Sequence, residues 1–270
     1  MDLGLKGKVA IVTGASQGMG AAISRRLAQE GCNVAMVARG EERLTALAAA
    51  ITASGGGEAL PVVCDVTSES DVADAVASAV ERFGGVDMLV NNAGGLTTGA
   101  LLPFEELSDD TFIATYELNV LGAVRFIRAV LPSMRQRGGG RIVNISSENG
   151  IQPDMVGADY NAAKAALNAL SKTLAKSLGV DNILVNTLSP GLTKTEALAR
   201  FIEDQATAEG KAPAEIEQGL LTGFRPNIAV GRAGEPDEIA AGVAFLLSAP
   251  ASFITGINLR VDGGSVSSIY

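Results

Sequence analysis

Histidine is absent from the 270-residue sequence, and cysteine occurs only twice, as Cys32 and Cys64. Without histidine, one chain cannot carry the serine–histidine or cysteine–histidine pairs of nucleophilic catalysis. The same shortage leaves a catalytic zinc ion without its usual ligands, so we expect no metal site. Burial as small hydrophobic side chains is the default for both thiols. A reducing, cytoplasmic environment fits this cysteine usage.

Basic residues are the minority of the charges, with 21 Lys and Arg against 30 Asp and Glu, which gives a net charge of −9. Nucleic-acid binding needs clustered lysine and arginine, so this balance argues against it. It also argues against anionic membrane surfaces. No hydrophobic run approaches the roughly 20 residues of a membrane span. The segment 1–8 is not typical of a signal peptide, because the first apolar run begins a strand.

Hydrophobic residues make up 47% of the chain, enough for a large buried core. Strand-like apolar runs alternate with alanine-rich helical stretches from end to end, with no linker between them. Such alternation requires right-handed crossovers. We expect residues 1–270 to form one three-layer, doubly wound α/β domain of Rossmann-like fold with a mostly parallel seven-stranded sheet. The expected strands are 8–13, 33–38, 60–64, 86–90, 141–145, 182–188 and 257–261.

A glycine-rich segment, TGASQGMG at residues 13–20, lies between the first expected strand and its helix. Its glycines permit positive φ angles and a close approach of the backbone to a ligand. The N-terminus of the helix offers free N–H groups and a positive dipole end to a pyrophosphate. In this position the segment predicts a dinucleotide site. The residues expected to contact the cofactor here are Thr13, Gly14, Ser16, Gln17, Gly18, Met19 and Gly20.

The end of the second expected strand predicts the coenzyme. NAD-preferring sites carry Asp or Glu there to bind the ribose hydroxyls. This chain has Ala38 followed by Arg39, whose guanidinium can bind a 2′-phosphate through paired donors. NADP(H) is therefore favoured. NAD(H) stays open, because Arg39 would also suit a solvated loop.

Tyr160 and Lys164 are four residues apart, so a helix places both side chains on one face. A phenol with a pKa near about 10 works as an acid–base catalyst at neutral pH only if its anion is stabilised, and a neighbouring ammonium can do this. Ser147 lies thirteen residues before the tyrosine, just after an expected strand. Its hydroxyl could hold a substrate oxygen while Tyr160 exchanges the proton.

These residues, the glycine-rich segment and the sequence NNAG at 91–94 together resemble the short-chain dehydrogenase/reductase family, from Lys8 to about Gly264. The resemblance implies hydride transfer between a nicotinamide and a secondary alcohol or ketone. It implies that Tyr160 transfers the proton and that Ser147 holds the substrate oxygen. It also implies that Lys164 binds the nicotinamide ribose and lowers the pKa of the tyrosine. It also implies that Asn119 is a fourth catalytic residue, which helps to hold a water that connects the lysine to solvent.

The resemblance implies further cofactor contacts after the other strands. Asp65 would contact the adenine, and Asn91 would fix the strand ends through side-chain to backbone bonds. The segment 190–195 would meet the nicotinamide carboxamide, although either of its threonines could equally cap a helix. Gln17 departs from many NADP-binding relatives, which have a basic residue near that position. In full, the cofactor contacts that the resemblance implies beyond the glycine-rich segment and Arg39 are Asp65, Val66, Asn91, Ala93, Gly94, Tyr160, Lys164, Pro190, Gly191, Thr193 and Thr195.

A substrate lid is expected at about residues 193–230, where a long segment follows the sixth expected strand. Its apolar half could cover either substrate or core. The expected partner is a small-molecule alcohol or ketone, without nucleic acid or membrane. By resemblance, the chain is expected to be a homotetramer or a homodimer built on its last helix and strand.

Two other functions stay open. One family branch reduces 3-oxoacyl groups on an acidic acyl carrier protein, for which basic docking residues are needed. Arg125, Arg128, Arg135 and Arg137 could supply some of them. The other function is a dinucleotide-binding regulator without turnover, although such proteins usually lose the tyrosine or the lysine.

Overall fold

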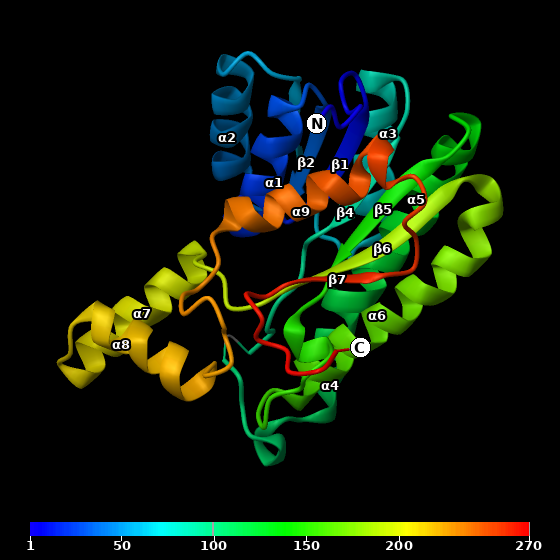
Figure 1. Cartoon of the computed structure of the whole chain (residues 1–270). Coiled ribbons are helices and arrows are strands. Elements are labelled where there is room, and N and C mark those ends of the chain that lie inside the picture. Colours follow the sequence, from blue (N-terminus) through cyan, green and yellow to red (C-terminus); the bar gives the residue numbers. More distant parts are fainter. Residues whose placement is uncertain (99, 270) are drawn as a thin grey trace.

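The computed structural model describes residues 1–98 and 100–269. Its centre is a seven-stranded sheet in the order β3-β2-β1-β4-β5-β6-β7, with every neighbouring pair parallel. Helices cover both faces, so the Rossmann-like, three-layer prediction is confirmed (Figure 1). The strands are β1 (Val9–Thr13), β2 (Asn33–Ala38), β3 (Ala59–Val63), β4 (Met88–Asn91), β5 (Gly140–Ile145), β6 (Ile183–Pro190) and β7 (Asn258–Val261). The helices are α1 (Gly18–Gln29), α2 (Glu41–Ala53), α3 (Glu69–Phe83), α4 (Asp109–Tyr116), α5 (Gly122–Gln136), α6 (Ala158–Leu178), α7 (Glu196–Glu209), α8 (Pro213–Gly219) and α9 (Pro236–Leu247).

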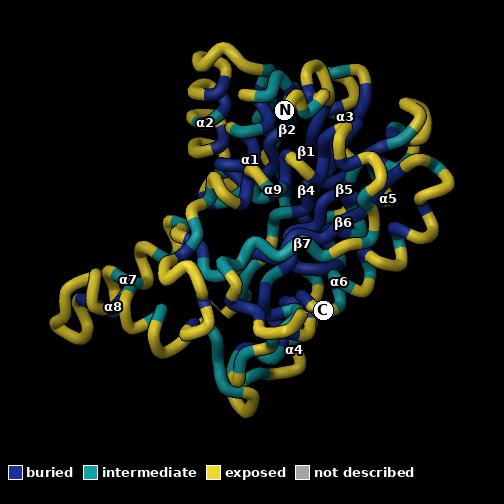
Figure 2. Tube along the Cα trace, in the orientation of Figure 1, coloured by how far each residue is buried: buried dark blue, intermediate teal, exposed yellow. Residues whose placement is uncertain are grey.

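Most of the central strands are buried on both faces, which explains the continuous hydrophobic runs of the sequence (Figure 2). In β1, Ala10 and Val12 face one core layer and Ile11 faces the other. The first layer includes side chains of α1, α2 and α9, and the second includes side chains of α3, α5 and α6. The two helical layers hold the sheet rigidly and leave its carboxyl edge free to carry a site.

The strand order reverses beside β1, because the chain runs outward through β2 and β3 and then returns to β4 on the other side. In open parallel sheets, ligands bind in the crevice at the carboxyl ends of the strands at such a switch point. Thr13 and Asn91 end the two strands that meet there, while β5 and β6 end at Ile145 and Pro190. Every segment expected at the site therefore begins at the same edge of the sheet.

The helices differ from the sequence prediction in one detail. The sequence pattern over about 109–136 predicts one long helix, but a π-helical turn, Glu117–Leu121, interrupts it between α4 and α5. After β6, α7 packs against α8 to form a hairpin that projects from the body of the molecule (Figure 1). Among the described residues, no helix combines the length and the hydrophobicity that crossing a membrane requires.

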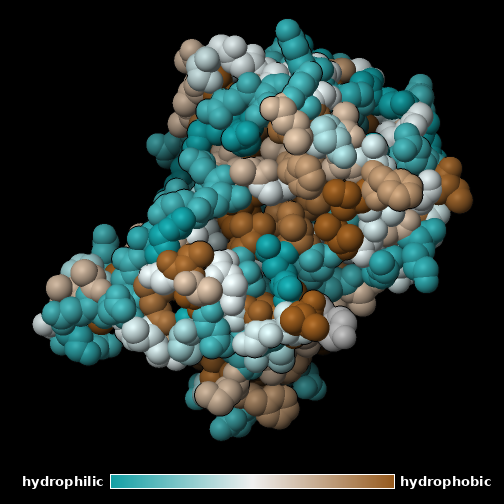
Figure 3. Space-filling model, in the orientation of Figure 1, coloured by the Kyte–Doolittle hydropathy of each residue, from teal (hydrophilic) through white to brown (hydrophobic). Residues whose placement is uncertain are grey.

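Strand β7 forms one end of the sheet, next to α9. Hydrophobic surface lies between these two elements in the space-filling view (Figure 3). Phe245 on α9 and Phe253 and Ile257 just before β7 are all exposed. This end of the sheet is therefore apolar as well as open.

Candidate active site

The glycine-rich turn after β1 has little room for side chains. Gly14 and Gly18 have φ angles of +64° and +55°, which favour glycine. A β-carbon at Gly20 would lie 2.2 Å from the carbonyl oxygen of Gly14, so α1 can start this close to β1 only without a side chain there. The turn borders a cavity of about 600 Å³ that Gly14, Ser16, Gln17, Gly18, Met19, Ala93 and Gly94 help to line.

Two residues fasten this turn to β4. The side chain of Asn92 donates from Nδ2 to the carbonyl oxygens of Thr13 (2.9 Å) and Gly14 (3.2 Å). In return, Thr13 Oγ1 accepts the backbone N–H groups of Asn92 (3.0 Å) and Ala93 (2.9 Å). Thr13 is buried, so it supports the cavity from behind.

The bonding expected of Asn91 is made by its neighbour, Asn92. Asn91 is buried, and its Nδ2 donates to Asn144 Oδ1 (2.8 Å) on β5 instead of to a backbone carbonyl. Asn92 lines the 600 Å³ cavity. The sequence analysis missed Asn92, although consecutive residues of a strand point to opposite sides and one of the pair had to face away from the core.

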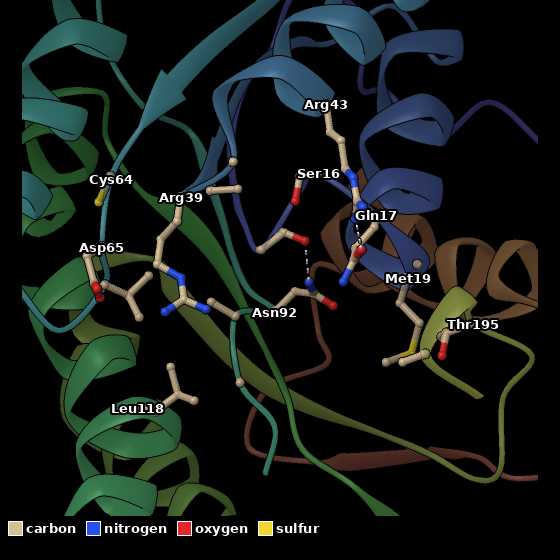
Figure 4. A pocket seen from close by; sticks show the side chains of 18 of the residues that line it. Ser16, Gln17, Met19, Arg39, Arg43, Cys64, Asp65, Asn92, Leu118 and Thr195 are labelled. Carbon is tan, nitrogen blue, oxygen red and sulfur yellow. Dashed lines mark hydrogen bonds between the residues drawn. The ribbon is translucent and has the colours of Figure 1, made fainter. Parts of the chain in front are cut away.

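Basic side chains lie at the end of the cavity where β2 stops (Figure 4). Ala38 and Arg39 both line it, and so does Arg43 in the first turn of α2, which was not predicted from the sequence. Arg43 Nη1 donates to Gln17 Oε1 (2.6 Å), so a basic group does lie beside Gln17. Glu41 and Glu42 line the same cavity.

Asp65 and Val66 also line this cavity, and Asp65 lies beside Arg39 in Figure 4. Asp65 accepts hydrogen bonds from the backbone N–H (2.9 Å) and the hydroxyl (2.8 Å) of Thr67. These bonds, and then the nearby charge of Arg39, lower the pKa of Asp65. Asp65 therefore structures its own turn and also faces the cavity.

A second cavity, of about 260 Å³, is lined by two of the four candidate catalytic residues. Ser147 and Tyr160 both line it, as do Pro190, Gly191 and Thr193 from the end of β6. Lys164 lies one turn beyond Tyr160 on α6, with Nζ 5.5 Å from the centre of the tyrosine ring. The same Nζ donates to the carbonyl oxygen of Ile145 (3.1 Å), where β5 ends.

Burial dominates the ionisation of these groups. It raises the pKa of Tyr160, while a hydrogen bond with Ser147 lowers it and the charge of Glu148 raises it. It also lowers the pKa of Lys164 to about 8. The lysine was expected to depress the pKa of Tyr160, but desolvation of the phenol is the largest effect and raises that pKa.

Asn119 lies in the π-helical turn between α4 and α5 and is buried. Its Nδ2 donates to the carbonyl oxygens of Thr115 and Gly95 (2.9 Å each), and its Oδ1 accepts the N–H of Gly95 (3.0 Å). A β-carbon at Gly94 would lie 2.7 Å from Asn119 Oδ1 and 3.2 Å from Lys164 Nζ. Asn119 and Lys164 therefore meet at Gly94, where a side chain would separate them.

Thr195 and Met19 line both cavities, so the two are parts of one continuous site. Thr195 is also the N-cap of α7, because its hydroxyl oxygen accepts the N–H of Leu198 (3.3 Å). The following residue, Glu196, accepts the N–H of Gly18 at the start of α1 (2.8 Å). Sequence analysis missed this contact between the start of α7 and the glycine turn.

The residues present fit NADP(H). The missing side chain at Gly20 allows the helix N-terminus to approach a diphosphate, and basic side chains lie at the far end of the larger cavity. The other end opens beside Ser147 and Tyr160 through Met19 and Thr195. The arrangement is that of a dinucleotide site joined to a small pocket with a positioned phenol.

A Rossmann-type sheet with a glycine-rich turn after β1 and a serine–tyrosine–lysine set indicates an oxidoreductase. A family model described as short chain dehydrogenase matches residues 8–206. The chain belongs to the short-chain dehydrogenase/reductase family.

Relatives match over nearly the whole chain. The 4-formylbenzenesulfonate dehydrogenase of Comamonas testosteroni is 36% identical over 262 residues, which cover 97% of this chain and 99% of the relative. The crystal structure of L-sorbose reductase from Gluconobacter frateurii, complexed with NADPH and L-sorbose, superposes with a TM-score of 0.94 at 36% identity and full coverage of both chains. A 7α-hydroxysteroid dehydrogenase complexed with NADH and 7-oxo glycochenodeoxycholic acid has a TM-score of 0.87 at 34% identity, covering 100% of this chain and 98% of that one.

Proposed function

We propose that this protein is an NADP(H)-dependent oxidoreductase that interconverts a secondary alcohol and a ketone of low molecular mass. The observation that carries the proposal is the continuity of the site. Ser147 and Tyr160 line a cavity that shares Met19 and Thr195 with the cavity over the glycine turn. The similarity to a reductase solved with NADPH and a ketose supports the same reaction class.

The chain's own residues would handle the proton and the substrate oxygen. NADPH, when bound, supplies the hydride. Tyr160 donates its proton to the carbonyl oxygen in reduction and accepts the hydroxyl proton in oxidation. Ser147 holds the same oxygen through its hydroxyl. Lys164, with its ammonium near the tyrosine ring, stabilises the phenolate, and Asn119 fixes the backbone beside that ammonium.

The basic end of the larger cavity supports NADP(H) over NAD(H). Arg39 and Arg43 line it, and Ala38 offers no carboxylate to a ribose hydroxyl. Guanidinium groups bind phosphate through paired donors, which suits a 2′-phosphate. The contact between Arg43 and Gln17 supplies the basic group that the glycine turn itself lacks.

Reduction of ketones tests the proposal directly. A panel of aliphatic, aryl, steroid and sugar-derived ketones is incubated with NADPH and with NADH, and the nicotinamide absorbance is followed. We expect oxidation of NADPH with at least one ketone. The absence of turnover with every ketone and both coenzymes would favour the regulator without turnover.

Tyr160→Phe tests the proton donor. It should lower kcat by about 10²- to 10⁴-fold, because a phenyl ring cannot exchange the proton. NADPH binding, measured by calorimetry, should be retained. Tyr116→Phe is the matched control, because Tyr116 is exposed on α4. Near-full ketone reduction by Tyr160→Phe would contradict the assignment.

The acyl-carrier alternative receives less support from the surface. Three of the four arginines considered for docking are held in ion pairs: Arg125 with Glu117, Arg135 with Asp181 and Arg137 with Asp87. Each pair reduces the positive charge available to an acidic carrier. A free small molecule is therefore the substrate that we propose.

We further propose that the chain associates into a homodimer or homotetramer through α9 and β7. The exposed apolar side chains there and the open end of the sheet support this. We also propose a cytoplasmic location. Both cysteines are free and buried, and burial raises their pKa values to about 12, so a reducing environment suits them.

A further inference from the structure

A buried ion-pair cluster lies at the wall of the 260 Å³ cavity. Arg225, which follows the helical hairpin, reaches back to the loop after Ser147. Its Nε donates to Glu148 Oε1 (2.6 Å), and its Nη1 and Nη2 donate to the two carboxylate oxygens of Asp154 (2.7 Å each). Nη2 also donates to Asn149 Oδ1 (3.1 Å). Arg225 is only 9% exposed and Glu148 only 4%.

One carboxylate oxygen of the cluster accepts no hydrogen bond from the described residues. Arg225 directs donors to Asp154, Asn149 and Oε1 of Glu148, whereas Glu148 Oε2 is buried without a hydrogen-bond partner among the described residues. One guanidinium faces two carboxylates, so the local formal charge is negative. A buried carboxylate oxygen without a donor is costly, and a hydroxyl group would supply that donor.

The position of Glu148 relates this oxygen to the chemistry. Glu148 directly follows Ser147, and both line the cavity that contains Tyr160. A substrate oxygen held by Ser147 and Tyr160 therefore has Glu148 beside it. This part of the site has a volume of about 260 Å³, close to the lower end of the roughly 300–1,000 Å³ typical of ligand pockets, which suits a small molecule.

We infer that Glu148 accepts a hydrogen bond from a substrate hydroxyl close to the reacting carbon, and that the substrate is a small, neutral hydroxyketone or polyol. This inference rests on the proposed function of the site. Arg225 is the positioning residue, because it fixes one oxygen of Glu148 and leaves the other for the substrate. The excess negative charge of the cluster disfavours a substrate carboxylate.

The wild-type protein provides the first test. With NADPH, kcat/KM is measured for 1,3-dihydroxyacetone, erythrulose and a six-carbon ketose, each against the unsubstituted ketone of the same carbon number. We expect a preference of at least about tenfold for the hydroxylated member. Turnover with equal preference would overturn the inference and leave the proposed function intact. No turnover with any ketone would instead contradict the proposed function.

A neighbouring hydroxyl also makes a carbonyl more reactive by itself. The decisive quantity is therefore the ratio of kcat/KM for the hydroxylated ketone to kcat/KM for the unsubstituted ketone, and how this ratio changes when Glu148 is substituted. Glu148→Met removes the acceptor and leaves Arg225 paired with Asp154. The hydroxylated-to-unsubstituted ratio should fall by about 10- to 100-fold. A merely structural role would lower both kcat/KM values together and keep the ratio, which would overturn the inference.

Glu148→Gln keeps an acceptor for Arg225 and weakens the contact with the hydroxyl, so its ratio should fall by about fivefold. If thermal melting shows that Glu148→Met does not fold, the ratio for Glu148→Gln tests the role of Glu148 instead. Glu81→Gln, an exposed glutamate on α3, is the matched control and should keep the wild-type ratio. A wild-type ratio in Glu148→Gln as well would exclude the assigned role.

Discussion

Lys164 illustrates how a residue proposed to take part in catalysis can oppose stability. It is 3% exposed, and its Nζ donates a hydrogen bond to the carbonyl oxygen of Ile145. Its pKa falls from the ordinary 10.5 to about 8 because burial disfavours the ammonium. The unfolded chain therefore binds more protons between pH 8 and 10.5, and this group makes the protein more stable as pH rises through that window. Below pH 8 the full destabilisation is present.

Lys164→Met should raise the free energy of unfolding at pH 7 by about 1–2 kcal/mol, less than the roughly 3 kcal/mol of the pKa shift because the bond to Ile145 is lost. The gain should shrink towards pH 10, while activity falls. Urea unfolding at pH 7 and pH 9.5 measures this difference. Lys176→Met, an exposed position on the same helix, should show no such dependence. A variant less stable than wild type at pH 7 would refute the prediction.

Arg39→Ala should change coenzyme preference. Because the guanidinium would face a 2′-phosphate, kcat/KM with NADPH should fall by about 10- to 100-fold, with little change for NADH. Steady-state kinetics with both coenzymes measure the ratio. Arg128→Ala, an exposed position on α5, is the control. Equal losses with both coenzymes would show that Arg39 does not distinguish them.

The site residues that can be predicted from the sequence are those related by short spacings along the chain. Tyr160 and Lys164 are one helical turn apart on α6. Arg43 was not predicted, because Arg39 lies before the start of α2 and helical spacing does not relate the two residues. Glu196 and Arg225 carry no such signal. Their partners Gly18 and Glu148 are 178 and 77 residues away in sequence, so only the folded chain brings them together.

At the scale of elements, the start of α7 is joined to the start of α1. Glu196 brings a carboxylate to the N–H of Gly18, at the helix end that should attract a diphosphate. Like charges repel, so Glu196→Gln should lower the Kd for NADPH by a few-fold at low ionic strength, and less in high salt. Calorimetric titration measures both. Glu203→Gln, exposed on the same helix, should leave the Kd unchanged; weaker binding by Glu196→Gln would oppose the prediction.

The interruption between α4 and α5 shows where prediction of elements stops. An asparagine in mid-helix is unfavourable, because its side chain competes with the backbone for hydrogen bonds. The widened turn itself depends on a tertiary partner, because the Asn119 side chain bonds both Thr115 and the backbone of Gly95. π-helical turns are rare and often occur at functional sites, so helical periodicity alone does not predict one.

At the scale of the whole molecule, the apolar end of the sheet predicts association. Light scattering should give a mass of two or four times the 27.5 kDa chain. Ile257→Glu places a charge in this surface and should reduce that mass, since burying an unpaired charge is costly. Ile113→Glu, on the exposed face of α4, tests the effect of a charge elsewhere. A monomeric wild-type protein would exclude the proposed assembly.

The alternation of strands and helices predicted the sheet because every layer repeats the same physical pattern. The projecting hairpin of α7 and α8 has no counterpart in that pattern. It is tied to the body near its two ends, where Glu196 meets Gly18 and Arg225 meets Glu148. Between these anchors, mutations can accumulate without disturbing the core. A change in this stretch can reach the cavity beside Tyr160 only through Thr195 and Arg225, the residues at its two ends that line that cavity.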